Sequence, residues 1–129
     1  MWWTPNHPFK SGLTGQSCAQ LAKAYEDATK RPWSQPIGFQ HALFEVAIDV
    51  LKRAKAIEPK AILDSIVATN YQSIVGPVQW TGKPVKNVTK TPLVGGQWRI
   101  KDGNKYDIVI TDNRTAPEIP VGGKMEAIT

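Results

Sequence analysis

Residues 39–56 are the segment that most restricts what this chain can fold into. Apolar residues recur there at spacings of three and four, which predicts a long helix. The apolar stripe is wide and contains Phe39, Ala42, Leu43, Val46, Ala47, Val50, Leu51 and Ala54, with Phe44 and Ile48 beside it. The polar stripe is narrow and contains His41, Glu45, Asp49, Lys52 and Arg53. Because so apolar a helix needs cover on most of its circumference, we expect more protein around it than this chain supplies.

Two further helices are predicted, one on each side of this segment. Residues 16–29 repeat apolar positions at helical spacing, with Thr14 or Ser17 as the N-cap. A third helix begins at Pro59, a residue suited to the first helical position, and ends near residues 69–70. The helical part of the chain is therefore expected to end there.

The second half of the chain changes from helical spacing to alternation, which indicates strands. Residues 73–80 predict one short strand that Gly76 and Pro77 interrupt. Alternating residues on both sides of a glycine-containing turn predict a β-hairpin. The hairpin strands are expected at residues 93–101 and 105–111, and the turns at residues 81–84 and 102–104.

Helices come first and strands come last, and no strand–helix–strand unit is present to build a parallel sheet. Taken alone, this order predicts an α+β fold. The expected parts are an extended first segment at residues 1–15, a helical part at 16–70, strands and hairpin at 71–112, and a tail at 113–129.

The charge of the chain is moderately basic, with 16 Lys and Arg against 11 Asp and Glu. A nucleic-acid-binding surface would gather these cations on one face. Here they are scattered, some at the end of a helix (residues 52–55) and others along a loop (residues 83–90). We therefore predict no nucleic-acid partner. The alternative, a small basic nucleic-acid-binding domain, rests on residues 83–90 with Trp80 and Trp98 nearby.

The residues with chemical potential do not form a catalytic or metal-binding pattern. His7 and His41 are the two histidines, and neither has further ligands at metal-binding spacing. Glu45 and Asp49 stand one turn apart beside basic residues, which predicts surface ion pairs and a solvated face that includes His41. Cys18 is expected as a small buried residue. We predict no enzymatic activity, catalytic residue, metal or cofactor.

Four segments together resemble one protein family. Residues 36–47 (PIGFQHALFEVA) resemble its long apolar helix, and residues 21–29 (LAKAYEDAT) the helix before it. Residues 74–82 (IVGPVQWTG) resemble its late strands, and residues 92–104 the closing hairpin. The order of these segments is similar to that of the type I periplasmic solute-binding proteins of ABC transporters, the family that binds leucine, isoleucine and valine. The resemblance covers residues 5–113.

The resemblance implies a fold and a function. It implies a periplasmic-binding-protein-like α/β fold with two lobes, of which this chain would be a C-terminal fragment, about the last third. It also implies a periplasmic location and capture of an amino acid or similar small molecule between the lobes, for delivery to a membrane permease. A ligand-sensing regulatory domain of the same fold is the alternative.

The resemblance places the loop at residues 33–39 where the family's chain approaches the ligand. Trp33, Gln35 and Phe39 are therefore the candidate ligand-binding residues, as aromatic walls with one amide. The alternative for Phe39 is a core residue at a helix start. Since a partial lobe leaves apolar surface uncovered, we also expect the chain to self-associate through the helix that begins at Phe39.

Overall fold

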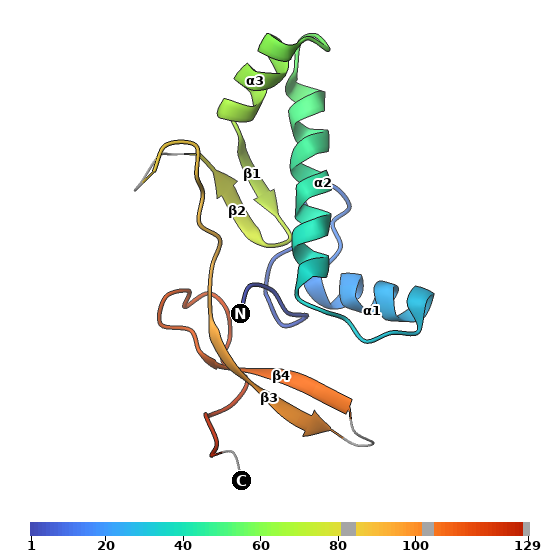
Figure 1. Ribbon diagram of the computed structural model, residues 1–129, viewed down its shortest axis with the longest axis vertical. Helices are drawn as coiled ribbons and strands as arrows, with labels where there is room; N and C mark the ends of the chain where they lie inside the picture. The colour runs from blue at the N-terminus through green and yellow to red at the C-terminus, as the bar shows by residue number, and fades with distance from the viewer. Residues whose placement is uncertain (81–84, 102–104, 128–129) are drawn as a thin grey trace.

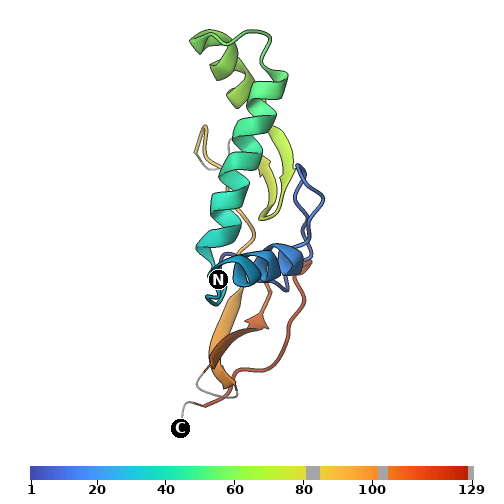
Figure 2. The same cartoon turned by 90° about the vertical axis from the view of Figure 1, so that its right-hand side faces the viewer.

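The computed structural model describes residues 1–80, 85–101 and 105–127, apart from the side chains of Lys101 and Lys105. It confirms a mixed fold in which helices precede antiparallel strands. The helices are α1 (Cys18–Thr29), α2 (Pro36–Arg53) and α3 (Pro59–Val67); the strands are β1 (Asn70–Ser73), β2 (Gly76–Gln79), β3 (Gly95–Lys101) and β4 (Lys105–Asp112). Helix α2 runs along the long axis of the molecule, and the β1–β2 hairpin lies beside it (Figures 1 and 2).

Helix α1 begins where the sequence supplies a complete capping box. The Ser17 side chain accepts a hydrogen bond from the Gln20 backbone N–H, and the Gln20 side chain accepts one from Ser17 N–H at 2.9 Å. Ser17 is therefore the N-cap, and the helix starts two residues later than predicted. It ends at Lys30, which adopts the left-handed conformation with φ of 58°.

Helix α2 begins and ends three residues earlier than predicted. Pro36 occupies the first turn, where its missing N–H and fixed φ cost nothing. At the other end Ala54 is extended, with ψ of 127°. The predicted third helix is confirmed as α3, beginning at Pro59.

The buried face of α2 matches the predicted apolar stripe only in part, since Ala42 and Val50 are buried as predicted. Glu45 is fully buried, so its predicted place on a solvated face is wrong. The reason is that the backbone N–H of Ile74 donates to its Oε2 at 2.9 Å, and the N–H of Leu13 donates to its Oε1 at 3.4 Å. The opposite face leaves three large apolar side chains exposed, at Leu43, Phe44 and Leu51. We call these three residues the outer face of α2.

The ion pair expected at Asp49 is confirmed. Its Oδ2 lies 2.8 Å from Arg53 Nη2 one turn along the helix. Arg53 also donates to the backbone oxygen of Ser65 at 2.8 Å, which ties the end of α2 to α3. Of the two acidic residues on the predicted polar stripe, one is therefore at the surface and one is in the core.

The single strand predicted at residues 73–80 is instead part of a tight hairpin. Ser73 pairs with Gly76, so Ile74 and Val75 form the turn. The Ser73 hydroxyl accepts from Val75 N–H at 3.2 Å and donates to the Gly76 carbonyl at 2.8 Å. Gly76 has φ of 100°, a conformation open to glycine at little cost. The predicted interruption at Gly76 is thus a reversal of the chain.

The closing hairpin is confirmed as β3–β4, with Trp98 paired to Ile108. The turns predicted at residues 81–84 and 102–104 lie outside the described residues. The C-terminal tail lies along this hairpin: the Gln97 side chain donates to the Glu126 carbonyl at 2.7 Å and accepts from Glu126 N–H at 3.0 Å. Figure 1 shows the tail returning beside β3.

Two apolar clusters hold these parts together. The first surrounds the fully buried Trp3 and contains Cys18, Ala22, Ala42, Ile74 and Val75. The second lies under β4 and contains Val94, Ile110, Ala116 and Ile119. Phe9 packs against both clusters. Cys18 is buried as predicted, and its sulfur accepts a hydrogen bond from Trp3 Nε1 at 3.2 Å.

Candidate functional site

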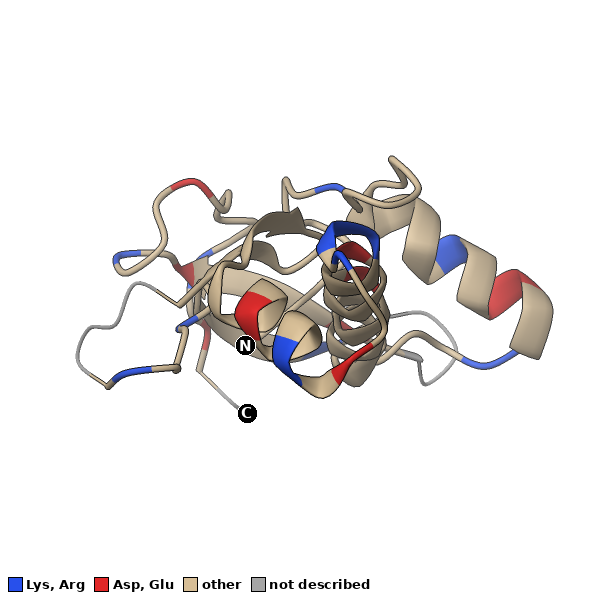
Figure 3. Cartoon of the chain, turned by 90° about the horizontal axis from the view of Figure 1, so that it is seen from above, with Lys and Arg blue, Asp and Glu red and all other residues tan. Residues whose placement is uncertain are grey.

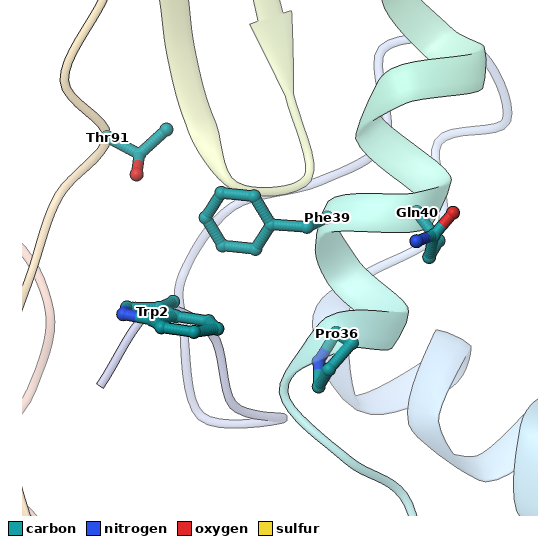
Figure 4. A pocket seen from close by; sticks show the side chains of 5 residues that line it. All are labelled: Trp2, Pro36, Phe39, Gln40 and Thr91. Carbon is teal, nitrogen blue, oxygen red and sulfur yellow. The ribbon is translucent and has the colours of Figure 1, made fainter.

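An open cleft of about 430 Å³ lies between the first residues of the chain, the start of α2 and the connection from β2 to β3. Its lining residues are Trp2, Pro36, Phe39, Gln40 and Thr91. Figure 4 shows the Phe39 ring in the middle, between Thr91 and Gln40, with Trp2 and Pro36 along one side. We call this the Trp2–Phe39 cleft. Its volume lies within the range of about 300–1,000 Å³ that small-molecule sites occupy.

The two aromatic walls of the cleft meet at a corner. The ring centroids of Trp2 and Phe39 are 6.1 Å apart and the ring planes are inclined by 74°. Trp2 remains 56% exposed, so much of its indole surface faces solvent. Phe39 is half-buried and packs against the first apolar cluster, which fixes this wall on the core.

Two uncharged polar side chains complete the cleft. The Gln40 amide can donate and accept, and the Thr91 hydroxyl can do both. Within the part of the chain that the structure describes, neither side chain makes an intramolecular hydrogen bond. An apolar cleft with a few free polar groups is the usual make-up of a small-molecule site.

Of the three residues that the sequence put forward as ligand contacts, Phe39 lines the cleft. Gln35 stands behind it: its side-chain oxygen accepts a hydrogen bond from Trp2 N–H at 2.9 Å and so holds the Trp2 wall in place. Trp33 packs edge-to-face on Trp3, with centroids 6.1 Å apart, and supports the core. Gln35 and Trp33 are therefore not among the residues that line the cleft.

Sequence reasoning missed four of the five lining residues. Trp2 is one of five tryptophans in the sequence, but no pattern ties it to a helix more than thirty residues away. Pro36 and Gln40 lie in the first turns of α2 with Phe39. They could be named as neighbours of Phe39 once α2 is known to start at Pro36. Thr91 belongs to a polar connection with no periodicity, and only the path of the chain brings it to the cleft.

A second cleft of about 470 Å³ lies at the start of β3, and its polar groups are engaged within the protein. Arg114 Nε donates to Asp112 Oδ2 at 2.9 Å, and the Thr115 hydroxyl donates to the Leu93 carbonyl at 2.7 Å. Arg114 also holds the pKa of the Asp112 carboxyl below its usual range through that hydrogen bond. A ligand here would have to compete with these contacts, so the Trp2–Phe39 cleft is the better candidate.

His41 is not on a solvated face as predicted. It is half-buried, and its Nε2 lies 3.1 Å from the hydroxyl of Ser11. Ser11 is itself only 3% exposed and accepts a hydrogen bond from Thr14 N–H at 3.0 Å. A serine this buried is out of reach of a substrate, so the contact fastens the first loop of the chain to α2. Glu45 also fastens this loop to α2, because its side chain accepts a hydrogen bond from the Leu13 N–H.

His7 is 4% exposed, and its Nδ1 accepts a hydrogen bond from Thr4 N–H at 3.1 Å. This places the proton of the neutral ring on Nε2. Burial, aided by the positive amino group of Met1 and opposed by Glu118, lowers the pKa of His7 to about 4. The folded protein therefore holds His7 neutral at pH values where an unfolded chain would protonate it.

Stability should consequently fall on acidification. Because the folded pKa lies below the ordinary value of 6.5, the unfolded state takes up the proton first, and stability present above pH 6.5 is lost as the pH falls towards 4. Allowing for solvent screening, we expect a loss of about 1–2 kcal/mol between pH 7 and pH 5 from this group. Urea unfolding at both pH values measures it. His7→Asn keeps an acceptor for Thr4 and should lack this component; an unchanged pH dependence would contradict the assignment.

The described residues contain neither a metal cluster nor a membrane-crossing helix. Across residues 1–80, 85–101 and 105–127, no three His, Cys, Asp or Glu side chains gather as metal ligands. In the same ranges, each helix is too short or too polar to span a bilayer. Figure 3 shows the Lys and Arg residues spread over separate helices and loops, with acidic residues among them.

Comparisons with protein-family models, with curated proteins and with solved structures find no match to this chain.

Proposed function

We propose that the chain is the C-terminal part of a two-lobed periplasmic solute-binding protein that delivers its ligand to an ABC permease. In this proposal the Trp2–Phe39 cleft is one wall of the solute site. The ligand is an amino acid or similar small molecule, and a second lobe closes over it and excludes water.

One observation carries the proposal. Phe39 was selected from the sequence because the family resemblance places it at the ligand, and it lies in the wall of an open apolar cleft. That cleft also holds two polar side chains, Gln40 and Thr91, without intramolecular partners among the described residues.

The outer face of α2 supports the same proposal. Leu43 and Phe44 are 65% and 68% exposed, and Leu51 is 54% exposed. Exposed apolar side chains that gather on one helix face mark a surface that other protein covers. A second lobe, or the rest of the same lobe, would provide that cover.

The isolated 129-residue chain should bind no amino acid with micromolar affinity. Its cleft is open on one side, and a ligand held by one wall gains too few contacts to offset the entropy lost on binding. Calorimetry of the purified chain against leucine, isoleucine and valine measures this. Micromolar binding by the isolated chain would show that a second lobe is not needed.

The proposal itself is tested on the product of the whole reading frame, established from the genomic sequence around this coding segment. We expect a further lobe and micromolar binding of a small solute. Trp2→Ala should weaken that binding about tenfold or more, whereas Lys23→Ala on the exposed surface of α1 should leave it unchanged. A product without a second lobe, or one whose solute binding is unchanged by Trp2→Ala, would overturn the proposal.

The isolated chain should also self-associate through the outer face of α2, because burying Phe44 and its neighbours removes apolar surface from water. Light scattering during size-exclusion chromatography should give a mass above that of the monomer. Phe44→Glu should weaken the association about tenfold or more, and Ala24→Glu on the exposed side of α1 should not. A compact monomer at all concentrations would contradict this expectation.

A further inference from the structure

The Trp2–Phe39 cleft has a chemical character that narrows the choice of ligand. None of its five lining residues, Trp2, Pro36, Phe39, Gln40 and Thr91, has an ionisable side chain. Moving an ammonium or carboxylate group from water into a site without an opposite charge is costly. This wall therefore suits the uncharged part of a ligand, and an ionic group would have to be held elsewhere.

The arrangement of the two rings favours a flat partner. Trp2 and Phe39 stand edge to face, at 74° and 6.1 Å. A planar ring placed in the corner between them can stack on one ring and present its edge to the other, the two arrangements that aromatic pairs prefer. An aliphatic side chain would fill the same space without these contacts.

The corner is formed before a ligand arrives. The Gln35 side-chain oxygen accepts a hydrogen bond from the Trp2 backbone N–H at 2.9 Å, and the Phe39 ring packs against the first apolar cluster. Pro36 fixes the first turn of α2 beside them. Walls that are already in place need little ordering on binding, which retains affinity that would otherwise be lost.

We propose that the Trp2–Phe39 cleft binds an aromatic ring that carries a neutral hydrogen-bonding group, such as an amide or hydroxyl. The ring lies in the corner of Trp2 and Phe39, and its polar group meets Gln40 or Thr91 on either side. This inference rests on the proposed function, since it names the ligand class for the same site, and it departs from an aliphatic amino acid as the solute.

The test uses the isolated chain and nuclear magnetic resonance, which detects millimolar binding through the indole N–H signal of Trp2, assigned by its loss in Trp2→Phe. Three probes are compared: benzamide, cyclohexanecarboxamide, which has the same amide on a non-aromatic ring, and zwitterionic leucine. We expect benzamide to shift the Trp2 signal with a millimolar dissociation constant. Cyclohexanecarboxamide should bind about two- to tenfold more weakly, and leucine should produce no saturating shift.

Two variants locate the binding. Because Trp2 is largely exposed, Trp2→Ala should fold normally, and it should abolish the benzamide-induced shifts of Gln40 and Thr91. Phe44→Ala, on the outer face of α2, should preserve them. Equal binding of benzamide and cyclohexanecarboxamide, leucine binding as tightly as benzamide, no benzamide binding, or shifts that persist in Trp2→Ala would each overturn the ring assignment.

The outcome separates this inference from the proposed function. If benzamide does not bind here and the longer protein still captures a solute in a Trp2-dependent way, the ring assignment alone is lost. If benzamide binds at the cleft and the longer protein has no second lobe, the transport proposal is lost and the aromatic site remains.

Discussion

Substitution of Gly38 by alanine is expected to destabilise the fold by about 3 kcal/mol, although alanine is the better helix former. A Cβ at position 38 would lie 2.3 Å from Cγ of Trp3, far closer than carbon atoms can approach. Trp3 is fully buried and its Nε1–H donates a hydrogen bond to the Cys18 sulfur, so the ring cannot move aside without opening the core. Urea unfolding followed by tryptophan fluorescence measures the loss.

A matched variant separates this clash from backbone effects. Ala47→Gly changes an exposed position of the same helix and should cost only about 0.5–1 kcal/mol, the difference in helix propensity. If Gly38→Ala were neutral or stabilising, propensity would outweigh packing at position 38, and Trp3 would not be in contact with α2 as described.

The elements that could be predicted are those whose signals are local. The helix at Cys18–Thr29 follows from helical spacing and from Ser17 as one of two candidate N-caps, and the β3–β4 hairpin follows from alternation around a predicted glycine turn. The helical period of α2 is also recognisable, but it predicts the buried face only in part, because Ala42 and Val50 are buried as expected and Glu45 is buried as well. Spacing shows which residues share a face, but the buried face was decided by Ile74 and Leu13, which reach Glu45 from 29 and 32 residues away.

The β1–β2 hairpin shows a second limit. Ile74 and Val75 are strand-forming residues by propensity, so the sequence predicts an interruption at Gly76 and Pro77 but no turn at Ile74 and Val75. They form one because Gly76 accepts a positive φ and because both side chains are buried in the first cluster. Burial of Ile74 and Val75 outweighs their local preference, so the reversal could be seen only in three dimensions.

The candidate site was predictable to a similar extent. Phe39 lies next to a small residue at the start of a long apolar helix, and the family resemblance predicts it as a ligand contact. Trp2 and Thr91 come from segments that share no pattern with α2, and the paths of the chain bring them together. Gln35 is predicted as a ligand contact, but it does not line the cleft, and its side chain accepts a hydrogen bond from Trp2 N–H instead.

The buried carboxylate of Glu45 leads to the second large effect. Glu45→Ala should destabilise the fold by about 3 kcal/mol, because it leaves the buried N–H of Ile74 and the partly buried N–H of Leu13 without acceptors. It would also open a void beside the first cluster. Urea unfolding gives the loss, and hydrogen exchange should show the Ile74 amide becoming unprotected well below global unfolding.

Asp49→Ala is the matched control for this prediction, since it lies one turn further along α2 and removes a carboxylate from the surface. Its ion pair with Arg53 is partly exposed, so its loss should cost at most about 1 kcal/mol. Glu45→Gln keeps one acceptor oxygen and should fall between the two. Equal losses for Glu45→Ala and Asp49→Ala would mean that Glu45 is solvated. The N-terminal loop would then be joined to α2 by the His41–Ser11 contact and apolar packing, and the β1–β2 turn by apolar packing.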